Sequence, residues 1–424
     1  MHTNKLSTAC IFLLLALMSL SCNDKDVFDE EEYKKLVEIA QPVEGIDADH
    51  TWSLTTTYYL VVDISEEFAG NERLQILSGN PVVGESAVVL GDYPVSGGGK
   101  KYIAFTAPST MTKFFAALID AQGIYTVTSF PNTQRTVTFP QSSMSRGPVD
   151  DRLVSQQALS FCYEDEMPEP GDYDYNDVVL RISQERIAQN QIMLNVTLAA
   201  VGSMKQVAGA LCLANYKYDD IESVTTVDGE TFDDGYKKPS LCFIKGDDLL
   251  LKGIDSVAVI NLFEDAHWAT GVAEYASEGY VERYMYNVSK ETGSSYDMMS
   301  PRTISYIVTF RNTSSLDYFT LDQIDPFIII EYMGSFMEVH PFHYRTQTAL
   351  YDYSQPTSAN ILPWALVVPG SSFRYPLDGV NIGFAKNGAL FGAYMTEGHS
   401  FGEWAANHTT AIDWYDYPTG NQVF

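Results

Sequence analysis

Positive charge is scarce in this sequence. Only 26 Lys and Arg residues are set against 55 Asp and Glu residues, which gives a formal net charge of −29. Because binding to nucleic-acid phosphates needs clustered Lys and Arg, nucleic acid is excluded as a partner. Charged residues make up 19% of the chain and aromatic residues 13%, whereas disordered chains are highly charged and poor in aromatics. Most of the chain is therefore expected to fold.

Cysteine is also rare, with five residues in the chain. Cys10 and Cys22 fall within the first 22 residues, which leaves Cys162, Cys212 and Cys242. Three is an odd number and no CxxC pair occurs, so neither a disulfide framework nor a thiolate zinc site is expected. Each of the three has apolar neighbours, which predicts buried free thiols.

The apolar run near the N-terminus is too short to cross a bilayer, which takes about 20 residues. Residues 9–20 follow Lys5 and have the length of a signal-peptide core. Ser19-Leu20-Ser21-Cys22 then resembles the cleavage site of bacterial lipoproteins, although Ser19 stands where a branched aliphatic residue is usual. We expect residues 1–21 to be a lipoprotein signal peptide and Cys22 to carry lipid. An ordinary secreted protein that is cleaved elsewhere is the alternative.

Residues 22–44 are rich in acids, including the run Asp29-Glu30-Glu31-Glu32. Acidic tracts at this position resemble the export signals of surface-exposed lipoproteins in some Gram-negative bacteria. Like charges repel one another, so the segment is also expected to act as an extended tether. Together these features predict a protein of the Gram-negative outer membrane that is lipid-anchored and exposed at the cell surface.

Strand-like runs separated by turn residues recur along the rest of the chain. The run TYYLVVDI at 57–64 and the turn Gly97-Gly98-Gly99 are examples. Short strands with such turns predict an all-β protein. We expect an N-terminal β-sandwich domain at 45–140, a polar linker at 141–150, and a larger β-rich domain of sandwich or jelly-roll type at 151–424.

A crowded acidic stretch is the most chemically informative feature. Seven carboxylates fall between Glu164 and Asp177, and Asn176 adds a carbonyl oxygen. Clusters made only of oxygen donors suit hard cations, and calcium accepts about 6–8 such ligands in irregular geometry. The predicted calcium ligands are Glu164, Asp165, Asp172, Asp174, Asn176 and Asp177.

The spacing Asp172-x-Asp174-x-Asn176 is similar to the start of an EF-hand loop, but the rest does not fit. Asp177 and Ser183 stand where that loop needs Gly and a bidentate Glu, and a strand-like run follows at once. A structural calcium ion ahead of a strand is therefore the favoured interpretation. In the alternative, the Asp and Asn side chains accept hydrogen bonds from turn amides and no ion binds. Repulsion among seven close acids favours the ion.

The same stretch resembles a family signature. Residues 163–165 (YED) and 171–179 (GDYDYNDVV) are similar to the FEDxxxxGDxDYNDVV motif of the LruC domain, with Tyr163 in place of the usual Phe. That domain occurs in bacterial outer-membrane lipoproteins, and a similar motif marks a module of calcium-dependent RTX-type adhesins. Weaker similarities later in the chain extend the resemblance over about 151–424. The resemblance implies an architecture and a cellular location, but the family has no settled activity.

Some sequence patterns resemble catalytic motifs, but the other residues that each kind of active site needs are not in the required positions. Gly398-His399-Ser400-Phe401-Gly402 matches the GxSxG pattern of hydrolases. The catalytic histidine of that fold follows the acid, yet His408 is the only later histidine and precedes both Asp413 and Asp416. His340 and His343 enclose a proline, and no HExxH zinc motif occurs. No residue is assigned a catalytic role.

The sequence therefore predicts a non-enzymatic surface protein that acts in adhesion or surface interaction, with a glycan or a host or matrix protein as partner. One alternative is a glycan-binding accessory lipoprotein of polysaccharide uptake. Exposed aromatic residues would stack on sugar rings there, and the stretch from Trp414 to Tyr417 is one candidate, although packing in the core is the favoured interpretation of that stretch. A hydrolase is the second alternative.

Overall fold

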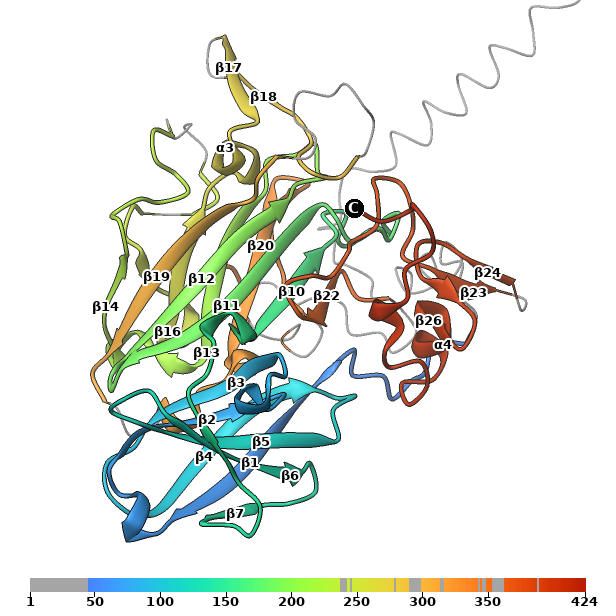
Figure 1. Ribbon diagram of the computed structural model, residues 1–424. Helices are drawn as coiled ribbons and strands as arrows, with labels where there is room; N and C mark the ends of the chain where they lie inside the picture. The colour runs from blue at the N-terminus through green and yellow to red at the C-terminus, as the bar shows by residue number, and fades with distance from the viewer. Residues whose placement is uncertain are drawn as a thin grey trace, which may run out of the picture. The chain divides into compact units, whose positions relative to one another are not determined.

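The computed structural model describes residues 45–424 apart from nine short gaps, which are 237–241, 245, 278–279, 290–298, 313–315, 342–343, 345–347, 353–361 and 387–388. The predicted signal peptide, the tether with Cys22, and His343 lie outside the described residues. Strands dominate the described chain (Figure 1), which confirms the all-β prediction; its α-helices are the short α3 (Ala266–Thr270) and α4 (Phe401–Ala406). Within the described ranges, no helix is both long and apolar enough to span a membrane.

The N-terminal part is a sandwich of two sheets, of order β4-β1-β7 and β8-β6-β5-β2-β3-β9. Apolar residues from both sheets form its core, among them Val62, Leu74, Phe114 and Phe139. The strands are β1 (Thr55–Ile64), β2 (Asn71–Leu77), β3 (Ala87–Pro94), β4 (Gly99–Pro108), β5 (Lys113–Asp120), β6 (Tyr125–Pro131), β7 (Thr136–Phe139), β8 (Ser145–Gly147) and β9 (Val154–Gln156).

At both ends of the predicted range 45–140, the chain makes contacts that the prediction did not include. The predicted linker contributes β8, which pairs with β6, and β9 then pairs with β3 in parallel, so the sheet continues to Gln156. At the other end, Trp52 and Leu54 pack into a core cluster of the C-terminal segment and not into the sandwich. The pairing of β9 with β3 leaves no local sequence signal, because the two strands are far apart in the chain.

The second part is built on two further sheets, of order β14-β19-β12-β11-β10-β22 and β15-β16-β13-β20-β21. The Tyr163 hydroxyl at the end of β10 donates a hydrogen bond to the Pro326 carbonyl in β20, which links the sheets. The strands are β10 (Ala158–Tyr163), β11 (Val178–Ala188), β12 (Gln191–Ala200), β13 (Ala208–Lys217), β14 (Ile221–Thr226), β15 (Leu250–Lys252), β16 (Val257–Phe263), β19 (Arg302–Phe310), β20 (Ile324–Tyr332), β21 (Ser335–Val339) and β22 (Ala365–Pro369). Short hairpins are β17 (Ala273–Ser277) with β18 (Tyr280–Arg283), β23 (Phe384–Lys386) with β24 (Ala389–Phe391), and β25 (Met395–Thr396) with β26 (His399–Ser400).

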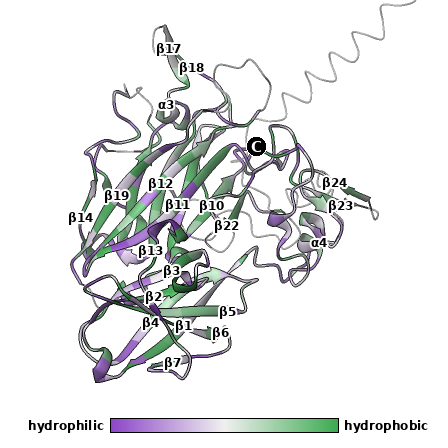
Figure 2. Ribbon diagram, viewed as in Figure 1, coloured by the Kyte–Doolittle hydropathy of each residue, from purple (hydrophilic) through white to green (hydrophobic). Residues whose placement is uncertain are grey.

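β10 and β22 are covered on both faces. Every residue of each strand is buried, and Figure 2 shows both as mostly hydrophobic strands. One face packs toward the second sheet, and the other faces the C-terminal segment, whose Trp404 and Trp414 share a core cluster with Cys162 and Leu366. Figure 1 shows this red C-terminal segment beside β22. Strands buried on both faces are expected to be continuously apolar, as these two are.

Candidate metal centre

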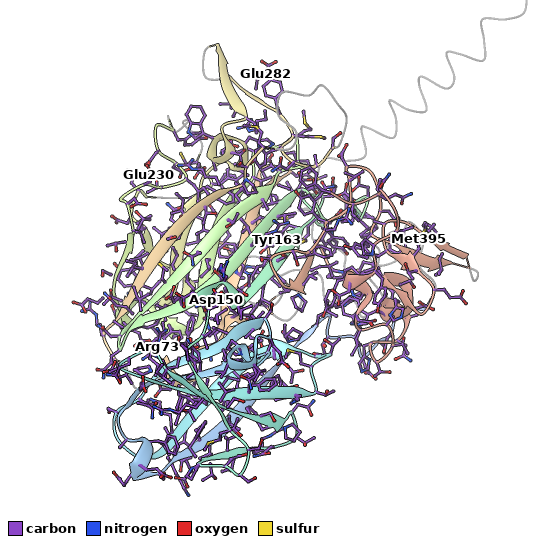
Figure 3. The ribbon with its side chains drawn as sticks, in the orientation of Figure 1. Arg73, Asp150, Tyr163, Glu230, Glu282 and Met395 are labelled. Atoms are coloured by element: carbon purple, nitrogen blue, oxygen red, sulfur yellow. The ribbon has the colours of Figure 1, made fainter. Side chains whose placement is uncertain are left out.

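The acidic loop joins two adjacent, paired strands of the larger sheet. β10 ends at Tyr163, which is labelled in Figure 3, and β11 begins at Val178 opposite it. Residues 164–177 therefore connect the end of β10 to the start of β11. Glu164 follows β10 directly and is fully buried. The loop thus starts and ends on rigid strands, which fixes where its side chains can point.

Glu164 organises the loop through its carboxylate. Its two oxygens accept hydrogen bonds from the backbone N–H groups of Tyr173, at 3.1 Å, and Tyr175, at 2.6 Å. Both tyrosines have left-handed backbone conformations, with φ of 59° and 53°. Such values are uncommon for residues other than glycine and cost about 1–2 kcal/mol each. This strain turns two backbone donors toward one carboxylate.

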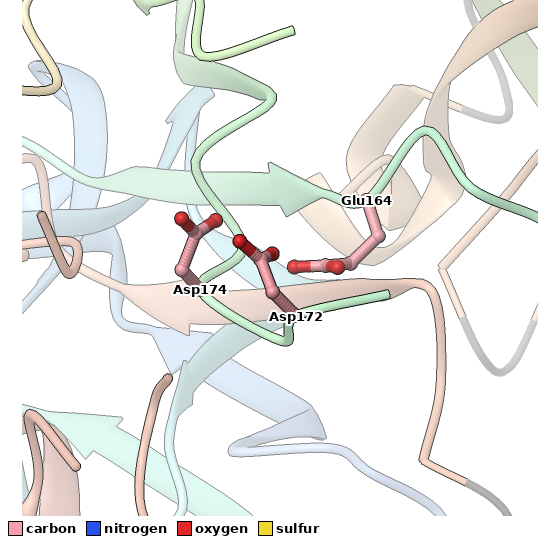
Figure 4. A group of neighbouring side chains, drawn as sticks. All are labelled: Glu164, Asp172 and Asp174. Carbon is pink, nitrogen blue, oxygen red and sulfur yellow. The ribbon is translucent and has the colours of Figure 1, made fainter. Parts of the chain in front are cut away.

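The alternation of Asp and Tyr in the loop separates two functions. Tyr173 and Tyr175 are buried in the core cluster beneath the C-terminal segment, and the Tyr175 hydroxyl donates to the Pro363 carbonyl at 2.7 Å. Packing of the rings therefore holds the strained backbone in place. Asp172 and Asp174 alternate with the rings, and Figure 4 shows the Asp172 carboxylate between those of Asp174 and Glu164.

Two carboxylate groups with the geometry of metal ligands share Glu164. In the first, Glu164, Asp172 and Asp174 each place an oxygen within 4.8 Å of the others. In the second, Glu164, Glu166 and Asp177 meet the same condition. The two groups together contain five carboxylates of this one loop. Such an all-oxygen set fits calcium.

Glycine is required at Gly171 by the close approach of these carboxylates. A Cβ atom there would collide with a Glu164 oxygen and would lie 3.0 Å from Glu166 Oε2. That same Glu166 oxygen is buried and has no hydrogen-bond partner in the part of the chain that the structure describes. A buried acceptor without a donor is costly, and a cation at this position would satisfy it.

Electrostatics leave these acids without enough counter-charge. Burial, reinforced by repulsion from Asp172, raises the pKa of Asp174 to about 8. Burial with repulsion from Asp165 raises the pKa of Glu166 to about 7, and the pKa values of Glu164 and Asp177 are raised well above their ordinary range by the same causes. Without a cation, the raised pKa values favour protonated carboxyl groups in the folded loop.

Acidification should therefore stabilise the metal-free protein. Between about pH 4 and pH 8 the folded loop holds protons that the unfolded chain releases, so the free energy of unfolding falls as pH rises through this window. Calcium needs deprotonated ligands, so the stabilisation by calcium should grow from pH 5 to pH 8. Melting temperatures at pH 5, 6.5 and 8, with calcium and with chelator, measure both trends. A calcium effect that does not change with pH would contradict this account.

Two of the six predicted ligands, Asp165 and Asn176, lie in neither carboxylate group. Asp165 forms an ion pair with Lys205 at 2.7 Å and accepts a hydrogen bond from the Ser203 hydroxyl. The Asn176 side-chain amide donates to the Pro376 carbonyl at 3.2 Å. These residues are better placed to hold the loop than to bind an ion. Conversely, Glu166 lies in the second carboxylate group, although it is not one of the six predicted ligands.

A second buried ionic cluster was not predicted from the sequence. His340 Nδ1 lies 2.8 Å from Asp325 Oδ2, and His340 Nε2 lies 3.1 Å from Glu338 Oε2. All three side chains are inaccessible to solvent. Burial opposes the protonation of His340, but the two carboxylates outweigh it and raise the pKa to about 9, while burial raises that of Asp325 to about 6. The imidazolium is thus a structural charge between two strands.

The hydrolase-like GxSxG sequence has a structural explanation. Ser400 is the N-cap of α4, where its hydroxyl accepts from the Glu403 backbone and the Glu403 carboxylate accepts from the Ser400 backbone. His399 instead pairs with Asp413 at 2.8 Å and stacks on Tyr417. Trp414 is fully buried, as its core interpretation expected. The motif therefore encodes a reciprocal helix cap.

Comparison with known proteins gives a family without an assigned activity. No curated protein matches the sequence. One solved structure, of a candidate lipoprotein from Bacteroides ovatus, is 12% identical and has a TM-score of 0.47, over 84% of this chain and 99% of the other. At this level of similarity we transfer neither fold nor function from it. Residues 190–415, more than half of the chain, match a domain of unknown function, DUF4842. This chain belongs to the DUF4842 family.

Proposed function

We propose that this protein is a lipid-anchored, non-enzymatic surface protein of the Gram-negative outer membrane whose acidic loop binds calcium in a structural role. The observation that supports it most is the pair of carboxylate groups that share Glu164 and together contain five carboxylates. The DUF4842 match begins after this loop, at residue 190, so the calcium proposal rests on the loop of this chain. The resemblance to the LruC motif and to calcium-dependent RTX-type adhesins supports the same assignment.

Calcium would join parts of the chain that are distant in sequence. Asp174 Oδ2 accepts a hydrogen bond from the Gly379 backbone at 2.8 Å, and the Pro376 carbonyl accepts one from Asn176. The loop therefore contacts the C-terminal segment through its own donors and acceptors. An ion at Glu164, Asp172 and Asp174 would remove the repulsion within the loop and so strengthen this contact. The expected result is a rigid display module, suited to adhesion.

The cellular location can be tested at Cys22. Replacing Cys22 with Ala removes the thiol that would be acylated, so the protein should move from the membrane fraction to the soluble fraction. In intact cells, external protease should degrade the wild-type protein but spare a periplasmic control. Membrane retention of the Cys22→Ala variant would show that the anchor is wrong. Protease resistance in intact cells would contradict surface exposure alone.

A further inference from the structure

We infer that a cleft beside the start of β10 binds an uncharged carbohydrate. The cleft has a volume of about 430 Å³, which is typical of small-molecule sites. Its walls come from the first sandwich, from the β9–β10 junction, and from segments that follow β22 and α4. Ala158 lines the cleft, whereas the acidic loop begins after Tyr163, so the two sites lie at opposite ends of β10.

The charge of the cleft excludes anionic ligands. Within the described ranges, the cleft is lined by no Lys, Arg or His, and its one charged side chain is Asp416. The whole chain has a net charge of −29, which repels phosphates, sulfated sugars and uronic acids at long range. The ligand is therefore not an anion, and a lining with a single carboxylate is mainly suited to uncharged polar groups.

The remaining lining combines hydrogen-bonding groups, one aromatic ring and aliphatic side chains such as Val88, Leu90 and Met111. The hydroxyls of Thr110, Ser371 and Ser372 and the amide of Gln157 can both donate and accept, as sugar hydroxyls do. Tyr415 adds an aromatic side chain that is half-buried, and aromatic rings pack against the apolar faces of ligands. A lipid would leave these polar groups unpaired, whereas a pyranose ring satisfies both kinds of surface.

Gln157 gives the most specific indication of a ligand. The residue is only 6% exposed, and its Nε2 has no hydrogen-bond partner among the residues described. Gln157 also lines a smaller cavity of about 30 Å³ together with Gln184, which has room for about two water molecules. Because Nε2 is buried beneath the lining, we expect the amide to turn toward the cleft when a sugar oxygen accepts a hydrogen bond from it.

The inference rests on the proposed surface role, because it names the partner of that role, but it does not require the calcium ion. Affinity electrophoresis of the full mature protein through gels that contain starch, laminarin, mannan or xylan tests it, with alginate and heparin as acidic probes. We expect retardation by at least one neutral polysaccharide and by neither acidic one. Parallel gels with calcium and with EGTA separate this result from the calcium proposal, which is measured by melting.

Two cleft variants and one control test whether any carbohydrate binding occurs in the cleft. Gln157→Leu removes the unpaired amide at similar volume and should weaken binding at least tenfold. Ser371→Trp fills the exposed mouth of the cleft and should abolish carbohydrate binding. This second variant tests the inference even if Gln157→Leu fails to fold. Tyr102→Ala is the control, since Tyr102 is 54% exposed on β4 outside the cleft. Absence of neutral binding, binding unchanged in both cleft variants, or loss of binding only in Tyr102→Ala would overturn the inference.

Discussion

Calcium added to the metal-free protein at neutral pH raises its melting temperature by several degrees. A ligand that binds only the folded state stabilises it by about 2.7 kcal/mol at a concentration 100-fold above its Kd. The physical reason is that the ion replaces protons on acids whose pKa values burial and mutual repulsion have raised, among them Asp174 and Glu166. Differential scanning calorimetry with excess calcium and with EGTA measures the shift.

Glu164→Gln should abolish this shift, because Glu164 belongs to both carboxylate groups. Glu222→Gln is the matched control: it makes the same change at an exposed position on β14, outside the loop, and should leave the calcium shift intact. Equal calcium shifts in wild type and Glu164→Gln would show that any binding occurs elsewhere. Magnesium at the same concentration should stabilise less, because it demands a more regular octahedral shell.

The second large effect is expected at Glu338. Its carboxylate accepts hydrogen bonds from the backbone N–H groups of Ala349, Leu350 and Tyr351, at 2.5–3.0 Å, and it also contacts His340. Glu338→Ala would leave these backbone donors and His340 Nε2 without an acceptor, although His340 Nδ1 would keep its contact with Asp325. Removing one partner of a buried ion pair costs about 3–5 kcal/mol. Chemical denaturation should therefore show a loss of at least about 3 kcal/mol.

Glu331→Ala is the control for this substitution, because Glu331 is exposed near the end of β20. Exposed positions of this kind change stability little, and we expect less than about 1 kcal/mol. If Glu338→Ala were as stable as Glu331→Ala, the buried cluster would have no structural role. Replacing the whole cluster with apolar residues of similar volume is expected to be much less harmful than removing Glu338 alone.

The sequence was sufficient for features that are local in the chain. The alternation in β1 and the turns around it predicted its strand, and the density of acids between Glu164 and Asp177 predicted where carboxylates gather. The buried thiols of Cys162 and Cys212 agree with their apolar neighbours, whereas Cys242 is only partly buried. The spacing of nearby residues determines these features, so they can be predicted from a single sequence.

Features that depend on distant pairing could not be predicted. The parallel pairing of β9 with β3 brings together residues more than 60 positions apart, and Trp52 meets Trp404 across most of the chain. Asp165 and Glu166 are neighbours in the chain but have different roles. Asp165 pairs with Lys205 in the turn after β12, whereas Glu166 lies in a carboxylate group that could bind the ion. Spacing alone gives these two neighbouring acids the same interpretation, and only the surrounding side chains distinguish them.

A crystal structure of the protein grown with calcium tests the central claim most directly. The account predicts a peak with anomalous signal at about 2.3–2.6 Å from carboxylate oxygens of Glu164, Asp172 and Asp174, with the left-handed conformations of Tyr173 and Tyr175 retained. A well-ordered loop at millimolar calcium with no such peak, and with hydrogen-bonded carboxyl groups in its place, would contradict it.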